Sequence, residues 1–135
     1  MRLVLDTNVI ISSIVTPGAP RKLFIRGISG EYIVLISTPI LKEIYDVLSR
    51  PKFRMSASEI RRILDLIRKS SNHVVVKSKF EVIENDPDDD IIINTAYDGN
   101  ANYIVSGDAH LLSIGSFHGI KIVGVGKMLE ILDKK

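Results

Sequence analysis

The sequence contains no cysteine, which excludes disulfide bonds and zinc sites built on thiolates. Histidine is also scarce: His73, His110 and His118 are scattered, and their spacing does not match the His-Glu-x-x-His pattern of zinc hydrolases. No apolar run reaches the length of about 20 residues that a membrane span needs. The carboxylate of Asp6 comes too early for a secretory leader. We therefore expect a cytoplasmic protein without a membrane partner.

The 135 residues are 45% hydrophobic and 25% charged, which is typical of one soluble domain spanning residues 1–135. Charge is distributed unevenly along the chain. Residues 1–72 carry 12 Lys and Arg against 6 Asp and Glu, whereas residues 73–135 carry 6 against 10. A basic surface beside an acidic pocket would suit a polyanion held next to bound cations. Halves of a sequence need not be halves in space, so the asymmetry alone decides nothing.

Short apolar runs alternate with patterns of helical periodicity along the whole chain. The expected strands are 3–5, 32–36, 73–76, 103–106 and 120–123. The expected helices follow Asp6 and Pro20 and then cover about 40–50, 56–71, 90–99, 109–112 and 128–132. Strands that are apolar along their whole length are typical of a parallel sheet covered by helices on both faces. The sequence therefore predicts an α/β fold with three layers, α/β/α.

Four carboxylates lie within five residues, directly before a run of three isoleucines: Asp86, Asp88, Asp89 and Asp90. Pro87 is expected to interrupt any helix here, so that the helix opens at Asp90. The isoleucines must be buried, and they hold the last aspartate at the edge of a core. One interpretation is a helix N-terminus, where the dipole and the free N–H groups favour acidic side chains.

More carboxylates are expected at the same edge of the sheet. Asp6 and Asp108 each follow a strand, and Glu43 lies at the edge of an apolar helical stripe. In parallel α/β sheets, ligands bind beyond the carboxyl ends of the strands. Carboxylates gathered there repel one another unless a hard cation such as Mg²⁺ or Mn²⁺ joins them. Such an ion can activate water for phosphodiester cleavage.

These motifs together resemble a PIN domain, and most closely the single-domain, VapC-like PIN proteins proposed as toxins of toxin–antitoxin pairs. The resemblance is carried by Leu5-Asp-Thr-Asn8, Glu43, Asp86-Pro-Asp-Asp-Asp90 and Ser106-Gly-Asp108. It implies a metal-dependent endoribonuclease that hydrolyses RNA phosphodiester bonds with Mg²⁺ or Mn²⁺. It also implies a parallel sheet in strand order 3-2-1-4-5, a homodimer and a small antitoxin partner.

The resemblance assigns roles to individual residues. The positions matching the acidic catalytic and metal-binding set are Asp6, Glu43, Asp90 and Asp108, and the supporting polar positions are Asn8 and Ser106. Asp90 is preferred over Asp89 because it precedes Ser106 by 16 residues, with Asp89 as the alternative. Asn94, one helical turn after Asp90, either faces the same cleft or is a polar surface residue.

Basic residues on the helix after Pro20 are candidates for contacts to the RNA backbone: Arg21, Lys22 and Arg26. The stretch from Arg50 to Arg62 is the next place to look, and a merely solvated helix face explains the first set equally well. Three other functions stay open. They are an RNA-processing PIN nuclease that is not a toxin, a metal-dependent nuclease or phosphatase with another substrate, and a non-catalytic RNA- or protein-binding PIN-like module. A flavodoxin-like domain whose aspartates are only caps would bind no Mn²⁺, which separates it from these.

Overall fold

The computed structural model describes residues 1–82 and 87–134. The strands are β1 (Arg2–Leu5), β2 (Ile33–Ile36), β3 (Ser71–His73), β4 (Tyr103–Val105), β5 (Ser116–Phe117) and β6 (Ile120–Val123). The helices are α1 (Thr7–Val15), α2 (Ala19–Ile28), α3 (Thr38–Leu48), α4 (Ala57–Ser70), α5 (Pro87–Asp98), α6 (Ala109–Ile114) and α7 (Val125–Asp133), with a 3₁₀ turn η1 (Pro51–Phe53). Within these residues, no helix has both the length and the apolar composition that crossing a membrane requires.

The strands form one sheet in the order β3-β2-β1-β4-β6-β5. The first five strands in this order run parallel, and β5 is added antiparallel to β6. The predicted order 3-2-1-4-5 is confirmed, with β6 in the fifth place. The prediction lacked β5, which has only two residues. It is joined to β6 by a tight turn in which His118 and Gly119 have φ values of 49° and 82°.

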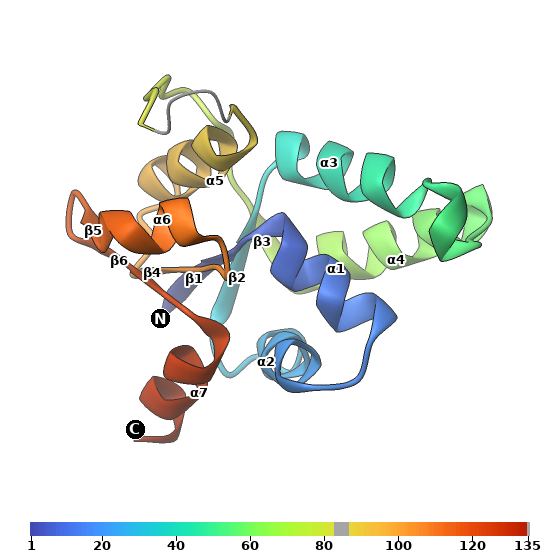
Figure 1. Cartoon of the computed structure of the whole chain (residues 1–135), viewed down its shortest axis with the longest axis horizontal. Helices are drawn as coiled ribbons and strands as arrows, with labels where there is room; N and C mark the ends of the chain where they lie inside the picture. The colour runs from blue at the N-terminus through green and yellow to red at the C-terminus, as the bar shows by residue number, and fades with distance from the viewer. Residues whose placement is uncertain (83–86, 135) are drawn as a thin grey trace.

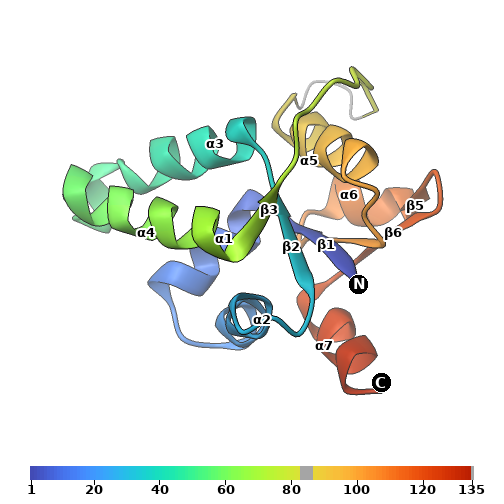
Figure 2. The same ribbon diagram turned by 180° about the vertical axis from the view of Figure 1, so that it is seen from behind.

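The sheet lies between helical layers, as the apolar strands predict. Leu3, Val4 and Leu5 of β1 are buried completely or nearly so. In both views, α5 lies on the opposite side of the sheet from α2 and α7 (Figures 1 and 2). Helices α3 and α4 lie together and extend to one side of the sheet (Figure 1). The three-layer α/β/α prediction is confirmed.

Two predicted boundaries were wrong in ways that matter for the site. Strand β3 is Ser71–His73 rather than 73–76, because α4 ends at Ser70 and the chain becomes extended at once. Helix α5 begins at Pro87 rather than at Asp90. Proline lacks an N–H group, but the first residue of a helix needs no N–H partner, so Pro87 starts the helix instead of interrupting it. Asp88 and Asp89 thus belong to the first helical turn.

Candidate functional site

The register of the central strands brings the ends of β1 and β4 together. Leu5 is paired with Val105, and the N–H of Asp6 donates a hydrogen bond of 2.9 Å to the carbonyl of Val105. The next residues, Asp6 and Ser106, therefore lie side by side at the carboxyl edge of the sheet. The hydroxyl of Ser106 donates a hydrogen bond of 2.7 Å to Oδ2 of Asp6. Both side chains are buried.

Asp108 is fixed at the same edge by the start of α6. Its backbone N–H donates to Oγ of Ser106 at 2.9 Å. Its Oδ1 caps the helix by accepting from the N–H groups of His110 at 2.8 Å and Leu111 at 3.2 Å. Ser106 thus bridges Asp6 and Asp108, the aspartates that follow the two strands.

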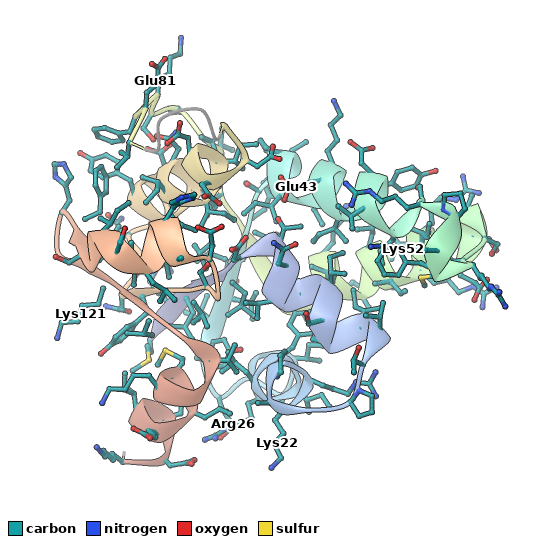
Figure 3. All side chains as sticks on the ribbon, viewed as in Figure 1. Lys22, Arg26, Glu43, Lys52, Glu81 and Lys121 are labelled. Atoms are coloured by element: carbon teal, nitrogen blue, oxygen red, sulfur yellow. The ribbon has the colours of Figure 1, made fainter. Side chains whose placement is uncertain are left out.

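A pocket of about 690 Å³ opens over these strand ends. Of the residues in 1–82 and 87–134, six carboxylates line it: Asp6, Glu43, Asp46, Asp88, Asp89 and Asp108. Asn8 also lines the pocket and is exposed, and Glu43 approaches from α3 (Figure 3). Segments that are more than 100 residues apart in sequence therefore contribute to one acidic site.

Crowding of the carboxylates changes their acidity. Burial raises the pKa of Asp6, the hydrogen bond from Ser106 lowers it in part, and repulsion by Asp108 raises it again. Burial raises the pKa of Glu43 to about 7, Thr7 opposes the shift, and the carboxylates of Asp88 and Asp6 add to it. The pocket therefore favours species that reduce its negative charge, either protons or cations.

The first turn of α5 faces the pocket with Asp88 and Asp89. Asp89 is buried and lines the pocket, whereas Asp90 is not among its lining residues. Oδ1 of Asp90 accepts a hydrogen bond of 2.9 Å from the N–H of Val82. Of the two aspartates named from the sequence, Asp89, the alternative, therefore lines the pocket, and Asp90, the preferred residue, does not. Asp86 lies outside the described residues.

Asn94 matches neither expectation, because it does not line the pocket and it is not a surface residue. Its side chain is buried. Its Oδ1 accepts from the N–H of Phe80 at 2.8 Å and from the hydroxyl of Ser78 at 2.9 Å, and its Nδ2 donates to the carbonyl of Phe80 at 3.1 Å. Asn94 therefore fastens the segment around Phe80 to α5.

One group of donors has a spacing suited to a metal ion. Within the described residues, ligand atoms of Asp89, Asp108 and His110 lie within 4.8 Å of one another. His110 is exposed, and its Nδ1 lies 3.8 Å from Oδ1 of Asp108. Sequence reasoning missed His110 because it compared the histidines only with the zinc-hydrolase pattern. Its position two residues after Asp108, at the start of a helix, was the available signal.

The basic residues of α2 lie away from the pocket. Arg21 donates from Nε and Nη2 to the carbonyls of Ser13 and Ile14, at 2.9 and 3.0 Å, and so caps the end of α1. Arg26 forms ion pairs of 2.9 Å with Glu31 and 2.8 Å with Asp133. Lys22 is exposed. Lys22 and Arg26 lie on the far side of the molecule from Glu43 (Figure 3). The cations that do line the pocket are Lys42 and Arg50.

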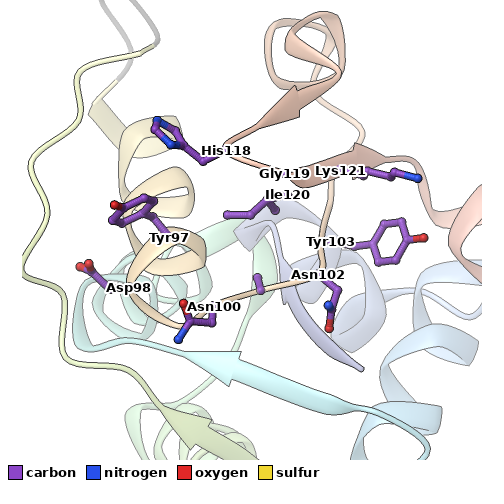
Figure 4. A pocket seen from close by; sticks show the side chains of 10 residues that line it. Tyr97, Asp98, Asn100, Asn102, Tyr103, His118, Gly119, Ile120 and Lys121 are labelled. Atoms are coloured by element: carbon purple, nitrogen blue, oxygen red, sulfur yellow. The ribbon is translucent and has the colours of Figure 1, made fainter.

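A second pocket, of about 670 Å³, lies at the opposite edge of the sheet, where β4 and β6 begin. Its polar groups serve the fold. The Oδ2 of Asp98 accepts from the N–H groups of Lys77 and Ser78, and Oδ1 of Asn102 accepts from the N–H of Arg2. The side chains of Tyr103 and Lys121 point away from Asp98 (Figure 4). The polar side chains of this pocket therefore do not gather as the carboxylates of the acidic pocket do.

The fold and the pocket define an α/β protein with a cluster of carboxylates at the carboxyl ends of its strands. The chain belongs to the PIN domain family, whose model matches residues 2–110. It is 34% identical over 118 residues to the protein MJ1680 of Methanocaldococcus jannaschii, covering 84% of this chain and 75% of that protein. Its fold is similar to a chain in the crystal structure of VapBC2 from Rickettsia felis bound to a promoter DNA fragment. The TM-score is 0.64 at 16% identity, over 92% of this chain and 98% of that one.

Proposed function

We propose that this protein is a metal-dependent endoribonuclease that hydrolyses phosphodiester bonds of RNA. One observation carries the proposal: carboxylates from β1, α3, α5 and the β4–α6 turn surround a single pocket at the carboxyl edge of the sheet. Membership of the PIN domain family supports a nuclease rather than a regulatory domain with the same carboxylates.

The donor set fits a hard divalent cation such as Mg²⁺ or Mn²⁺. All six carboxylates offer oxygen ligands, and the raised pKa values of Asp6 and Glu43 reflect burial and mutual repulsion that a cation would relieve. The residues that would hold the ion are Asp6, Asp89 and Asp108, with Glu43 on the facing helix. When bound, such an ion supplies an activated water and stabilises charge on the leaving oxygen.

The other side chains prepare this site. The hydroxyl of Ser106 orients the Asp6 carboxylate by donating a hydrogen bond to Oδ2, and its oxygen accepts a hydrogen bond from the N–H of Asp108. The cap that Asp108 forms on α6 fixes the direction of its carboxylate. Asp90 and Asn94 hold the segment around Phe80 and Val82 against α5, which supports the turn that carries Asp89. The ligands are therefore positioned before any ion binds, which reduces the cost of organising them.

We further propose that the protein is the toxin of a type II toxin–antitoxin pair, acting in the cytoplasm as a homodimer that a small antitoxin restrains. The support is the similarity of fold to a chain of the Rickettsia felis VapBC2 structure, together with the resemblance of the sequence motifs to VapC-like proteins. A gene for a small DNA-binding protein that overlaps or abuts this one would favour the toxin. Its absence would favour an RNA-processing enzyme.

The test is cleavage of single-stranded RNA by the purified, chelator-treated protein, with Mg²⁺ or Mn²⁺ then added back. We expect cleavage only with the ion, and none by Asp89→Asn, with Asp90→Asn as the matched control. Equal cleavage of single-stranded DNA would indicate a nuclease of another class. Tight Mn²⁺ binding without any turnover would indicate a non-catalytic RNA- or protein-binding module.

A further inference from the structure

Two cations, one on α3 and one just after its end, line the pocket together with the carboxylates. Lys42 precedes Glu43, and Arg50 follows the end of α3; both side chains line the acidic pocket. Arg50 lies beyond Ser49, the C-cap of α3, and its backbone is extended, so the two cations reach the pocket from α3 and from the segment that follows it. Both are exposed. They are referred to below as the α3 cation pair.

The α3 cation pair is not used to hold the fold together. Within the described part of the chain, neither Lys42 nor Arg50 takes part in an ion pair. Arg21 and Arg26, by contrast, are committed to helix capping and to ion pairs. The positive charge available to an external anion near the pocket therefore comes from Lys42 on α3 and from Arg50 just after it, and not from α2.

The charge of the pocket makes such cations necessary. Among the residues that the structure describes, its lining includes six carboxylates and two cationic side chains, an excess of four negative charges when all are ionised. A divalent cation would remove half of that excess, which still leaves a field that repels an RNA backbone. The path of least repulsion into the pocket therefore runs past Lys42 on α3 and Arg50 just beyond the end of that helix.

We infer that Lys42 and Arg50 bind phosphate groups that flank the bond to be cleaved, so that the RNA strand enters along α3. Arg50 offers a planar fork that can bind one phosphate with two hydrogen bonds, and Lys42 offers a compact charge beside Glu43. This inference rests on the proposed ribonuclease function and assigns the substrate-binding side of the same site.

The test compares Lys42→Gln/Arg50→Gln with Lys22→Gln/Lys121→Gln. Both double variants remove two positive charges, but Lys22 and Lys121 are exposed and lie away from Glu43 (Figure 3). Binding of a single-stranded oligoribonucleotide of mixed sequence is measured against salt with Mg²⁺ present. All proteins carry Asp6→Asn to suppress turnover. Each phosphate contact contributes roughly 0.7 to the slope of log affinity against log salt, so losing two contacts should flatten it by about 1.4.

We expect the flattening only in the Lys42→Gln/Arg50→Gln protein, whose affinity at low salt should fall correspondingly. Without Asp6→Asn, the same pair of changes should raise KM for RNA cleavage and leave kcat within about twofold, because the contacts exist before and during the reaction. Equal slopes and equal KM values for the two double variants would overturn the inference while leaving the ribonuclease proposal intact. If the native protein neither binds nor cleaves RNA, the proposed function fails, and this inference fails with it.

Discussion

The hydroxyl of Ser106 donates a 2.7 Å hydrogen bond to Oδ2 of Asp6, joining the ends of two neighbouring strands that are 100 residues apart in sequence. The same oxygen accepts the N–H of Asp108 at 2.9 Å. One buried serine therefore sets the direction of a carboxylate and the position of the turn that carries another. Ser106 thus positions two of the carboxylates that line the acidic pocket.

Replacing Ser106 by alanine should weaken metal binding by roughly 10- to 100-fold, the usual effect of losing a residue that orients a metal ligand. The change leaves the N–H of Asp108 and an oxygen of buried Asp6 without their partner, so stability should also fall by about 1–3 kcal/mol. Titration calorimetry with Mn²⁺ measures the first effect and thermal unfolding the second. Ser113→Ala is the control, because Ser113 lies on α6, does not line the pocket, and donates its hydroxyl to the carbonyl of His110. Equal Mn²⁺ affinities for the two variants would show that Ser106 is not a positioning residue.

Asp89→Asn should abolish Mn²⁺ binding and RNA cleavage, whereas Asp90→Asn should retain both. The reason is placement: Asp89 lines the pocket, while Asp90 accepts the N–H of Val82, which an asparagine oxygen can also accept. Asp90→Ala should lower stability by about 1 kcal/mol through loss of that hydrogen bond. The measurements are Mn²⁺ titration, cleavage rate and unfolding for all three proteins. Loss of activity in Asp90→Asn alone would return the ligand role to Asp90.

The metal-free protein should become less stable as pH rises from about 4.5 to about 7. The pKa of Glu43 is raised from 4.5 to about 7, so the folded state binds this proton more tightly than the unfolded state. The stability that it contributes is complete below pH 4.5 and is lost as pH rises through 7. The raised pKa of Asp6 acts in the same direction. Unfolding temperatures measured with a chelator present should show the decline, and Glu43→Gln should flatten it. A metal-free protein whose stability increases across this range would contradict the prediction.

His110→Ala should lower the affinity for Zn²⁺ or Ni²⁺ by about tenfold and leave Mg²⁺ affinity almost unchanged. An imidazole suits these ions, whereas Mg²⁺ takes carboxylate and water oxygens. We expect this because ligand atoms of His110, Asp89 and Asp108 lie within 4.8 Å of one another. His118→Ala is the matched control, since His118 is exposed in the β5–β6 turn. Competition titrations with a metal indicator measure each ion, and parallel behaviour of the two variants would remove His110 from the site.

In sedimentation, the protein should behave as a dimer at micromolar concentration, with twice the 15.0 kDa mass of the chain. Leu66 on α4 and Val75 after β3 are 50% and 69% exposed, which leaves apolar surface for a second copy to cover. Leu66→Glu should shift the equilibrium towards monomer if α4 forms part of that surface. A species of 15 kDa for the native chain at this concentration would contradict the expectation.

Much of the architecture was determined by local sequence. Fully apolar runs predicted buried parallel strands, and the carboxylates that directly follow β1 and β4 had to lie at their carboxyl ends. The resemblance of the motifs supplied the strand order. The positions of Asp6, Ser106 and Asp108 could be predicted in this way because each residue lies within three residues of the end of β1 or β4.

Tertiary structure alone decided which aspartate of α5 faces the pocket. Consecutive residues on a helix differ in direction by about 100°, so the choice between Asp89 and Asp90 depends on where the helix begins and what holds it. The helix begins at Pro87, and the carboxylate of Asp90 accepts a hydrogen bond from the N–H of Val82. The same holds for the cations. The sequence could not show that Arg26 is paired with Asp133, 107 residues away, or that Lys42 and Arg50 both line the acidic pocket. Long, flexible side chains contact partners that only the folded chain brings near.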